Sequence, residues 1–263
     1  MQTMNESVST PNIHPTLSSA FRSGVQAAAT SRRANDFLNR LSPAALDDLA
    51  SLEPPAHYEP GAILFSEQEL PTGVFLVLEG EVKLSMNSSD GKRLILRIAR
   101  AGEALGLTSA LSGSPSEITA EVLYSSKIIP IGRRDFLNFL MRHPEAYQVV
   151  TEELSRELSK ACEQLRTVGL SSSAPEKLAR LLLDWSQNGQ STENGTRFRF
   201  CLTHEEIGEC IGASRETVTR TLTDLKNQGL IRLNGSTLIV PSCMALAVYA
   251  GIDSMRFPNE PVA

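Results

Sequence analysis

The sequence predicts an α+β fold in three successive parts, and three patterns within its 263 residues support that prediction. Short runs rich in Val, Ile, Leu and Phe, separated by glycines, occupy residues 58–130. An apolar seam with helical spacing follows from residue 147 to residue 168. Two short helices joined by a tight turn, and then a hairpin, lie within residues 174–250. We therefore expect a small barrel or jelly roll, a long helix and a winged helix-turn-helix, in that order.

Composition excludes several classes of protein. The apolar fraction of 41% suffices for ordinary cores, and the net charge of −5 shows that the chain is not a polycation. Any contact with nucleic acid must therefore depend on a local patch. Four scattered cysteines argue against a disulfide scaffold and fit a reducing, cytoplasmic compartment. No apolar run approaches the roughly 20 residues of a membrane span, so no membrane partner is expected.

The two ends of the chain are expected to be tails. Residues 1–34 are rich in Ser, Thr, Ala, Asn and Pro and lack the apolar stretch of a signal peptide, which predicts a disordered tail. A transit peptide is the alternative, because this segment is poor in acids and ends near Arg32 and Arg33. Residues 251–263 are expected to form a C-terminal tail.

The first folded part is expected to span residues 35–143. A short helix should begin at Pro43, with Ser42 as its N-cap. Strands are expected in the runs AILF, GVFLVLEGEVKLSM and RLILRIA, and Asp90-Gly91 between two such runs predicts a hairpin. Regular short strands with glycine turns indicate a small barrel or roll.

The second part is a predicted helix over residues 144–168, followed by a hinge at residues 169–173. Its apolar seam recurs at alternating steps of four and three, with charged residues around it. The seam consists of Tyr147, Thr151, Leu154, Leu158, Ala161, Leu165 and Val168. A helix packed on its own domain would account for this pattern. A dimerising coiled coil accounts for it better, because the seam is narrow and its flanks are charged.

The third part, residues 174–250, contains the clearest local signals. The segment APEKLARLLLDWSQ is an amphipathic helix and RFRFCL is a short strand. Thr203 and Glu206 have the spacing of a capping box. A turn at Gly212-Ala213 and an N-cap at Ser214 introduce a second helix. Asn234-Gly235 then predicts a hairpin with a type I′ turn, which completes a winged helix-turn-helix.

The second helix of this motif carries a pattern suited to reading bases. Arg215, Glu216 and Arg220 share one face, while Val218 and Leu222 lie on another. Arginine pairs with guanine O6 and N7, and glutamate accepts from cytosine N4. The candidate DNA-binding residues, including hydroxyls suited to phosphates, are Thr203, Ser214, Arg215, Glu216, Thr217, Thr219 and Arg220. A solvated charged face is the alternative, but the flanking capped helix, turn and wing favour DNA.

Charge within this part is balanced. Residues 174–250 hold eight Lys or Arg and eight Asp or Glu. Non-specific affinity for DNA should therefore be modest, and dimerisation should matter more than it does for a basic domain.

Residues 40–245 resemble the cyclic-AMP receptor protein and fumarate–nitrate regulator (Crp/Fnr) superfamily of bacterial transcription factors. The most specific segment is LTHEEIGECIGASRETVTRTL, followed by LKNQGLI; GVFLVLEGEVKLS and RRDFLNFLMRHPE support the match. The resemblance implies a β-roll of the cyclic-nucleotide-binding type, a dimerisation helix and a winged helix. Arg215, Glu216 and Arg220 match the base-reading positions of the cyclic-AMP receptor branch, which implies a palindrome of TGTGA-type half-sites. RNA polymerase is a further partner implied by the family.

The sensor departs from the family pattern. Cyclic-nucleotide binders have a glutamate where this chain has Leu107, and an arginine within the segment that aligns near Glu117 to Ala120. No Lys or Arg occurs between Arg100 and Lys127. A cyclic phosphate would meet Glu117 and Glu121, so we expect that cyclic AMP does not bind. Gln68 also replaces a glycine common in the family, and the effector is unknown.

No cofactor or metal is expected. An iron–sulfur sensor needs four cysteines in the sensor half, and the first cysteine is Cys162. A haem would need an axial ligand, for which only His57 and His143 are available within the sensor. Redox sensing by Cys162 is an alternative to its being a small helix residue. Cys201, His204 and Cys210 lack an evident fourth zinc ligand and are interpreted as core residues.

The predicted function is a homodimeric, sequence-specific transcription regulator bound to double-stranded DNA. The alternative is a ligand-binding β-roll whose winged helix makes protein contacts. Arg215 and Glu216 discriminate between the two, because a protein-binding wing does not need that pair at the helix start. An enzyme is not expected, since no catalytic or P-loop constellation occurs.

Overall fold

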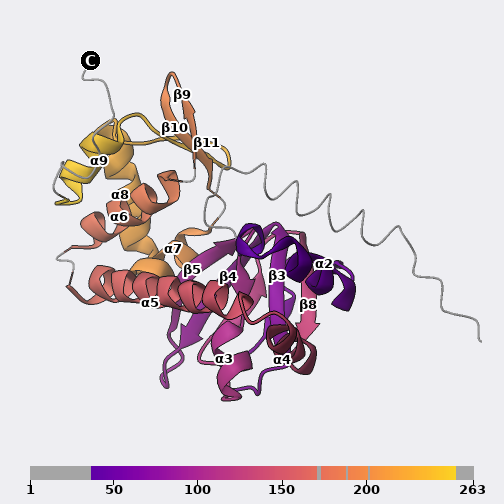
Figure 1. Cartoon of the computed structure of the whole chain (residues 1–263). Coiled ribbons are helices and arrows are strands. Elements are labelled where there is room, and N and C mark those ends of the chain that lie inside the picture. Colours follow the sequence, from indigo (N-terminus) through magenta and orange to yellow (C-terminus); the bar gives the residue numbers. More distant parts are fainter. Residues whose placement is uncertain (1–36, 171–172, 188, 201, 253–263) are drawn as a thin grey trace, which may run out of the picture. The chain divides into compact units, whose positions relative to one another are not determined.

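The computed structural model describes residues 37–170, 173–187, 189–200 and 202–252 (Figure 1). The chain divides into two compact units. The first combines Met1–Val82, Ala99–Ser116 and Glu121–Glu153, and the second combines Lys83–Ile98, Glu117–Ala120 and Leu154–Ala263. The predicted tail at 1–34 lies outside the described residues, and so does the predicted tail at 251–263 except for Gly251 and Ile252. Among the described helices, none is long and apolar enough to cross a membrane.

The β-roll predicted for the N-terminal part is present. Its helical elements are η1 (Leu38–Arg40), α2 (Pro43–Leu52), α3 (Leu107–Ser112) and α4 (Arg133–Arg142). Its strands are β1 (Ala56–Tyr58), β2 (Ile63–Phe65), β3 (Gly73–Glu79), β4 (Glu81–Asn87), β5 (Arg93–Arg100), β6 (Ala104–Leu105), β7 (Thr119–Val122) and β8 (Ser126–Gly132). They form two four-stranded sheets, in the orders β1-β8-β3-β6 and β2-β7-β4-β5.

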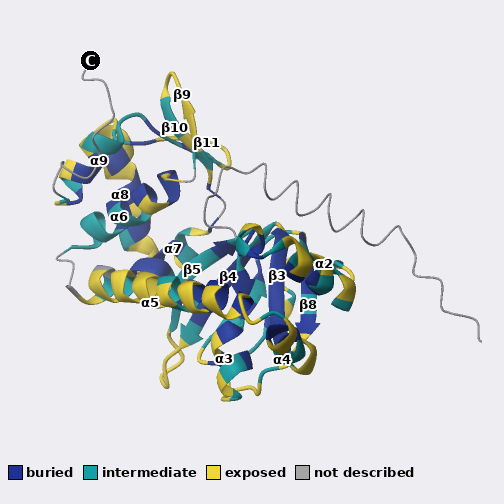
Figure 2. Cartoon of the chain, in the orientation of Figure 1, coloured by how far each residue is buried: buried dark blue, intermediate teal, exposed yellow. Residues whose placement is uncertain are grey.

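Burial follows the strand pattern that the sequence predicts. In β3, six consecutive residues from Gly73 are buried, and Val74 and Val77 are fully inaccessible (Figure 2). Helix α4 contributes Phe136, Phe139 and Leu140 to the same interior. The predicted start of α2 is confirmed, because the Ser42 hydroxyl accepts a hydrogen bond from the Ala45 amide at 3.2 Å with proline at the first turn.

Two turns of the roll are informative. The predicted hairpin between β4 and β5 is confirmed, with Gly91 at φ 81° and the Ser88 amide bonded to the Lys92 carbonyl at 2.8 Å. The loop after β2 places Gln68 at φ 64°, the one non-glycine residue with positive φ among the described residues. The backbone thus keeps a left-handed conformation although this chain has no glycine there.

The long helix α5 spans Ala146–Leu170, so it begins and ends two residues later than the predicted 144–168. Helix α6 (Ala174–Ser186) follows, and the Ser173 hydroxyl accepts from the Glu176 amide at 3.4 Å. The predicted hinge at 169–173 therefore overlaps the last turn of α5 and the cap of α6, and its residues 171–172 lie outside the described part.

The C-terminal part is a winged helix-turn-helix, as predicted. Its elements after α6 are β9 (Gln190–Thr192), β10 (Gly195–Arg199), α7 (His204–Ile211), α8 (Arg215–Asn227), β11 (Arg232–Asn234), β12 (Thr237–Val240) and α9 (Cys243–Tyr249). The strands form one sheet in the order β11-β12-β10-β9, which we call the wing sheet. The predicted strand RFRFCL corresponds to β10, which begins and ends earlier.

The type I′ turn predicted at Asn234-Gly235 is wrong. Asn234 is paired with Thr237, so the two loop residues are Gly235 and Ser236. Gly235 has φ 58°, whereas Ser236 has no positive φ, and a type I′ turn requires both. A positive φ at the first loop residue alone matches the requirement of a type II′ turn, which places glycine there.

Candidate nucleic-acid interface

The first helix of the motif, α7, begins at a complete capping box. The Thr203 hydroxyl accepts from the Glu206 amide at 3.2 Å, and the Glu206 carboxylate accepts from the Thr203 amide at 2.9 Å. Two backbone donors that the helix leaves unpaired are thus satisfied. The predicted capping role of Thr203 and Glu206 is confirmed.

Two glycines shape the turn between α7 and α8. Gly212 ends α7 at φ 65°, the left-handed conformation that glycine adopts most easily. Gly208 lies one turn earlier, and a Cβ atom added there would be 2.4 Å from the Ala213 carbonyl oxygen. The backbone of the turn therefore packs directly on α7, and a side chain at position 208 has no room.

Helix α8 separates packing residues from polar residues. Its N-cap is Ser214, as predicted, whose hydroxyl accepts from the Thr217 amide at 3.3 Å. Val218 and Leu225 are fully buried, and Thr221 and Leu222 are each 3% exposed. Arg215, Glu216 and Arg220 are exposed on the other side of the helix. Packing thus explains the residue types on the buried face of α8. It does not explain why the exposed face carries two arginines and a glutamate.

The charged side chains on the exposed face of α8 are available to bind a ligand. Within the described part of the chain, no ion pair within 4.0 Å joins Arg215 or Arg220 to an acid, so both guanidinium groups can contact a ligand. The Glu216 amide, the Ser214 hydroxyl and the Arg215 charge lower the pKa of the Glu216 carboxyl. Glu216 is therefore ionised at neutral pH and can accept hydrogen bonds, as a cytosine N4 donor requires.

The predicted phosphate-binding hydroxyls already have partners in the free chain. Thr219 Oγ1 bonds to the Arg215 carbonyl at 2.9 Å and lies 2.7 Å from His204 Nδ1 on α7. Ser214 Oγ and Thr217 Oγ1 lie 3.2 Å apart. Thr203 caps α7. Thr203 thus lies at the start of α7, and Ser214 and Thr217 lie at the start of α8. Thr219, one turn into α8, joins the two helices through His204.

Two polar side chains outside the motif, Lys83 and Gln164, hold it to other elements of the second unit, and neither was predicted from the sequence. Lys83 on β4, only 4% exposed, pairs with Glu206 at 2.9 Å. The Gln164 amide on α5 donates to the Ile95 carbonyl at 3.3 Å and to the Cys210 carbonyl at 2.8 Å. These residues are distant in sequence, so no local pattern marks them.

Electrostatics at Glu206 reflect these contacts. Burial alone would raise the pKa of its carboxyl, but the Thr203 hydrogen bond and the Lys83 ammonium hold the pKa below its usual value. The capping carboxylate therefore stays charged at neutral pH, and the ion pair with buried Lys83 is retained.

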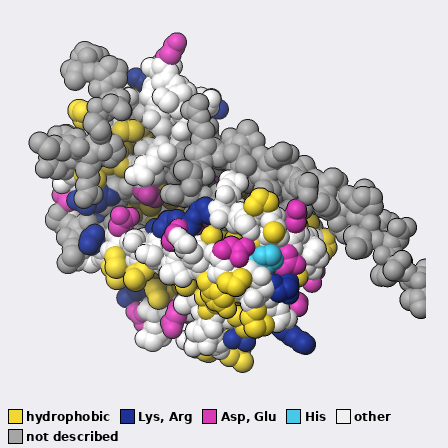
Figure 3. All heavy atoms as spheres, in the orientation of Figure 1, with side chains coloured by type: hydrophobic (Ala, Val, Ile, Leu, Met, Phe, Trp, Pro, Cys, Tyr) yellow, Lys and Arg dark blue, Asp and Glu magenta, His cyan; other side chains and the backbone are white. Residues whose placement is uncertain are grey.

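The predicted dimer seam lies along α5. Leu158 and Leu165 are 67% and 70% exposed, and Tyr147 is 45% exposed. Thr151 and Ala161 are also exposed, while Leu154 and Val168 are half-buried. Figure 2 shows exposed residues along much of α5, and Figure 3 shows hydrophobic side chains at the surface of the face that carries it. Among the described residues, no element covers the exposed members of this apolar stripe.

The segment around α3 has a buried leucine at the position where cyclic-nucleotide binders have a glutamate. Gly106 caps α3 at φ 80°, and Leu107, its first residue, is fully buried. Sequence analysis found no cation in the surrounding segment, but the fold brings one from α4. Arg133 Nε donates to the Ala110 carbonyl at 2.8 Å, so this cation is bound to the end of α3. Glu117 is exposed and Glu121 is half-buried.

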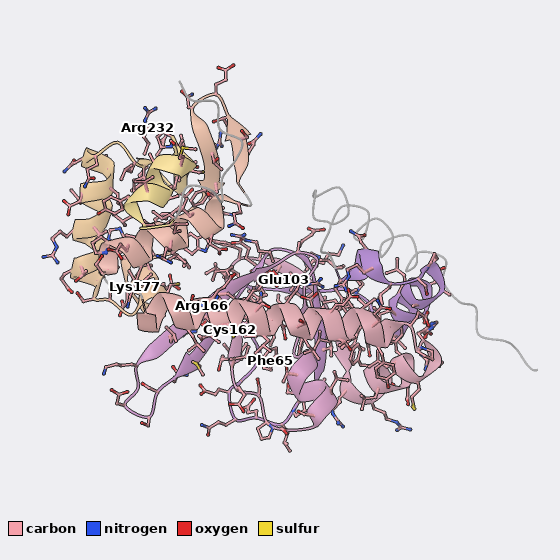
Figure 4. The ribbon with its side chains drawn as sticks, turned by 60° about the vertical axis from the view of Figure 1, so that its left-hand side comes forward. Phe65, Glu103, Cys162, Arg166, Lys177 and Arg232 are labelled. Carbon is pink, nitrogen blue, oxygen red and sulfur yellow. The ribbon has the colours of Figure 1, made fainter. Side chains whose placement is uncertain are left out.

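The histidines and cysteines considered as ligands are dispersed. His57 is exposed on β1, and His143 lies 3.0 Å from Asp48 and 3.5 Å from Glu145. Burial, followed by Glu209, raises the pKa of the Cys210 thiol to about 12, which suits a core residue. Cys162 is exposed on α5 (Figure 4). Among the described residues no group of three His, Cys, Asp or Glu could hold a metal, and Cys201 lies outside them.

Comparisons with known proteins agree with this geometry. A model of the Crp-like helix-turn-helix domain matches residues 176–249, and a model of the cyclic nucleotide-binding domain matches residues 55–143. The chain is 30% identical over 192 residues to the transcriptional activatory protein AadR of Rhodopseudomonas palustris, covering 73% of this chain and 79% of that protein. These matches include the roll and the winged helix.

Two further similarities extend the comparison. A CRP-like cAMP-activated global transcriptional regulator of Mycobacterium tuberculosis is 26% identical over 208 residues, with 79% of this chain and 92% of that protein covered. The solved structure of FixK2 from Bradyrhizobium japonicum has a TM-score of 0.67 at 21% identity, covering 75% of this chain and 96% of that one. The second similarity concerns the fold.

Fold and site together define a DNA-binding transcription regulator with a roll of the cyclic-nucleotide-binding type and a winged helix-turn-helix. The chain belongs to the Crp/Fnr family of transcription regulators. Its relatives are transcription regulators and not enzymes, in agreement with the predicted class.

Proposed function

We propose that this protein is a homodimeric regulator that recognises a palindrome of TGTGA-type half-sites through Arg215, Glu216 and Arg220. One observation carries this proposal: these three charged side chains are exposed on α8, and the opposite face of that helix supplies all of its buried contacts. Packing does not require charged residues at these three positions, so binding of a ligand is the simplest reason for their presence. RNA polymerase is the partner through which such a regulator would act.

The chemistry of the three side chains supports double-stranded DNA as the ligand. Arg215 lies at the start of α8, the end of a recognition helix that reaches base edges. A guanidinium group pairs with guanine O6 and N7, and an ionised glutamate accepts from cytosine N4. An arginine next to a glutamate can thus contact a guanine and a neighbouring cytosine.

The uncovered stripe on α5 supports a homodimer. Tyr147, Leu158 and Leu165 expose apolar area along one helix with heptad spacing, and a second copy of α5 would cover it. Two recognition helices related by a twofold axis would then meet half-sites about 34 Å apart, one turn of duplex. A palindrome is the sequence that this symmetry requires.

Selection of binding sites from random duplex DNA tests the proposal. We expect enrichment of a palindrome related to TGTGA-N6-TCACA. Enrichment of an unrelated site would remove the base-reading assignment. Failure to enrich any sequence would favour the protein-binding alternative for the winged helix.

We further propose that the roll does not bind cyclic AMP at micromolar concentration. Leu107 is fully buried where a ribose-binding carboxylate would be needed, and the segment between Arg100 and Lys127 has no cation for the phosphate. A buried phosphate without a charged partner loses several kcal/mol, and about 1.4 kcal/mol corresponds to a tenfold loss in affinity. The effector, if there is one, belongs to another chemical class.

Calorimetric titration with cyclic AMP, beside DNA-binding assays with and without the nucleotide, tests the sensor proposal. We expect no micromolar isotherm and equal DNA binding in both assays. A micromolar isotherm, or DNA binding that requires the nucleotide, would show that Arg133 or another residue supplies the missing charge.

A further inference from the structure

Helix α8 carries three threonines whose hydroxyl groups bond back to its own backbone. The hydroxyls of Thr219, Thr221 and Thr223 each donate to the carbonyl four residues earlier, at 2.9, 2.8 and 2.9 Å. Such bonds are common for threonine in helices and do not by themselves indicate a function. Within the described part of the chain, Thr219 is the one of the three whose oxygen also contacts another helix. It lies 2.7 Å from Nδ1 of His204 on α7.

The direction of the bond between the two helices follows from the chemistry of a hydroxyl group. A hydroxyl has one hydrogen to donate and two lone pairs with which it accepts. Because Thr219 donates its hydrogen to the Arg215 carbonyl, the contact at 2.7 Å requires a hydrogen on Nδ1 of His204. In a neutral imidazole, Nε2 then carries no hydrogen and can only accept. The network thus assigns the tautomer of His204.

This direction changes the role that the sequence predicts for Thr219. Its hydroxyl is suited to a phosphate, but a phosphate oxygen accepts hydrogen bonds and needs a donor. The one hydrogen of Thr219 is directed at the Arg215 carbonyl, and the one ring hydrogen of neutral His204 is directed at Thr219. In this network both side chains therefore act on the backbone of α8, with no hydrogen left for a phosphate.

The network ends at the residue that the proposed function places at a base. Arg215 is the first residue of α8, and its side chain is exposed. His204 is the first residue of α7 and directly follows Thr203, the cap of that helix. The two helices pack on each other (Figure 1), and buried side chains such as Val218 hold the inner face of α8. Thr219 is exposed, so the bond to His204 holds the outer side of the first turns.

We propose that His204 and Thr219 are positioning residues for DNA recognition, which hold the first turn of α8 at the angle that Arg215 needs to reach its base. The proposal rests on the proposed function, because it assumes that Arg215 reads a base pair. Hydrogen bonds to a base edge are directional, whereas attraction to phosphates depends mainly on charge. A small rotation of this turn should therefore weaken binding to the palindrome more than binding to an unrelated duplex.

Substitutions at His204 test the donor. The measured quantity is the specificity ratio, which is the affinity for the palindrome divided by the affinity for an unrelated duplex of the same length, at one salt concentration. H204A should lower this ratio about 2- to 12-fold, the range that corresponds to one neutral hydrogen bond. H204F keeps a ring without a donor and should behave like H204A. H204N should restore most of the ratio, because its amide nitrogen is attached to Cγ, as Nδ1 is in histidine.

Substitution of Thr219 tests the other partner and has a matched control on the same helix. T219V removes the hydroxyl at nearly constant volume and should lower the specificity ratio by about the same factor as H204A. Thr223 is exposed and makes the same backbone bond, at 2.9 Å to the Thr219 carbonyl, without an imidazole beside it. T223V should therefore leave the specificity ratio as it is in the native protein.

A double-mutant cycle shows whether the two residues act as one unit. H204A/T219V should lower the specificity ratio no further than either single change, because each change alone already breaks the bond. Two factors that multiplied would show that the residues act independently. Circular dichroism melting of every variant separates this role from a structural one, since a general loss of stability would change the melting temperature without changing the ratio.

Heteronuclear NMR of the neutral imidazole ring checks the assigned tautomer directly. The chain has four histidines, and the signal that is lost in H204N identifies His204. We expect the hydrogen on Nδ1. A hydrogen on Nε2 would reverse the bond to Thr219 and overturn the assignment.

Two binding results would also overturn the proposal. An unchanged specificity ratio in H204A and T219V, with the native protein still preferring the palindrome, would show that the bond does not position Arg215. Equal loss of affinity for both duplexes would show that the two residues contact phosphates directly. If the native protein itself showed no preference for the palindrome, the proposed function would fail first, and the positioning role would fail with it.

Discussion

Helices α3 and α8 both follow a glycine with positive φ, but their first turns have different surroundings. Helix α3 follows Gly106 at φ 80°, and α8 follows a turn that contains Gly212 at φ 65°. The first residue of α8 is an exposed arginine, whereas the first residue of α3 is Leu107, which is fully buried. The N-terminus of α8 is capped by Ser214, whereas α3 has no side-chain cap. The start of one helix is available to a ligand, and the start of the other is part of the core.

Polar residues that serve recognition therefore differ from structural ones in having no part in packing. At α8, packing is complete without Arg215, Glu216 and Arg220, so these residues are free to serve recognition. At α3, an apolar side chain occupies the position where a ligand-binding carboxylate would be needed. Leu107 is fully buried there, so this position contributes to the core of the roll.

The largest expected effect tests whether the seam on α5 is the dimer interface. Introducing charge through L154E/L158E should separate the proposed dimer, because two like-charged carboxylates would face their symmetry mates across the seam. Affinity for the palindrome should fall about 100-fold or more, since the two half-sites would no longer be bound together. Sedimentation velocity and DNA titration measure the two effects.

A control for the dimer prediction changes charge beside the seam. Ser159 is exposed on α5, one residue from Leu158 and outside the seam. S159E should remain dimeric and bind the palindrome normally. A dimer that persists in L154E/L158E would move the interface to another surface.

The next effect concerns the turn that positions α8. Gly208→Ala would place a Cβ atom 2.4 Å from the Ala213 carbonyl oxygen. We expect a loss of about 1–3 kcal/mol of unfolding free energy, the usual cost of an overpacked site. Gly169→Ala is the matched control, because it has no atom within 4 Å on α5 and should be neutral or stabilising. Chemical denaturation compares the two, and equal stabilities would show that the turn can move away.

A third substitution sharpens the distinction between specific and general contacts. Arg215→Ala should cost about 1–3 kcal/mol at the palindrome and relax the preference at one G·C pair. Lys226→Ala removes one positive charge from the last turn of α8 and should affect specific and unrelated DNA equally. Binding assays with single base-pair replacements measure this. An undiminished preference at every base pair would exclude Arg215 as a base-reading residue.

The smallest effect tests the roll. Gln68 has φ 64°, which costs about 1–2 kcal/mol for a residue with a side chain, and glycine avoids that cost at an entropic penalty of about 0.5–1 kcal/mol. Gln68→Gly should therefore stabilise the protein by up to about 1.5 kcal/mol. Gln68→Ala keeps the strained backbone and should bring no gain. If Gln68→Gly were destabilising, the side chain would have a role beyond the turn.

The sequence predicts structure correctly where local chemistry determines it. The capping box at Thr203, the cap at Ser214 and the helix start at Pro43 depend on neighbours three residues away, and all three are present. It failed at β9, whose three residues are polar and exposed and are held by pairing with β10. The type I′ turn failed because strand register placed Gly235 one position earlier in the loop.

The candidate site shows the same limit. Arg215, Glu216 and Arg220 could be identified from spacing, because one helix supplies all three. The contacts of Lys83 with Glu206 and of Gln164 with two carbonyls join segments far apart in sequence, which no local pattern reveals.

The division of α8 into a buried and an exposed face has a consequence for how such regulators diversify. The residues that keep the helix in place are Val218, Thr221, Leu222 and Leu225, and none of them belongs to the proposed reading set. Exchanging Arg215, Glu216 or Arg220 would therefore alter the target sequence at little cost in folding. A duplicated copy of this gene could acquire a new set of promoters through a few substitutions on one helix, while the proposed dimer seam and the roll stayed as they were.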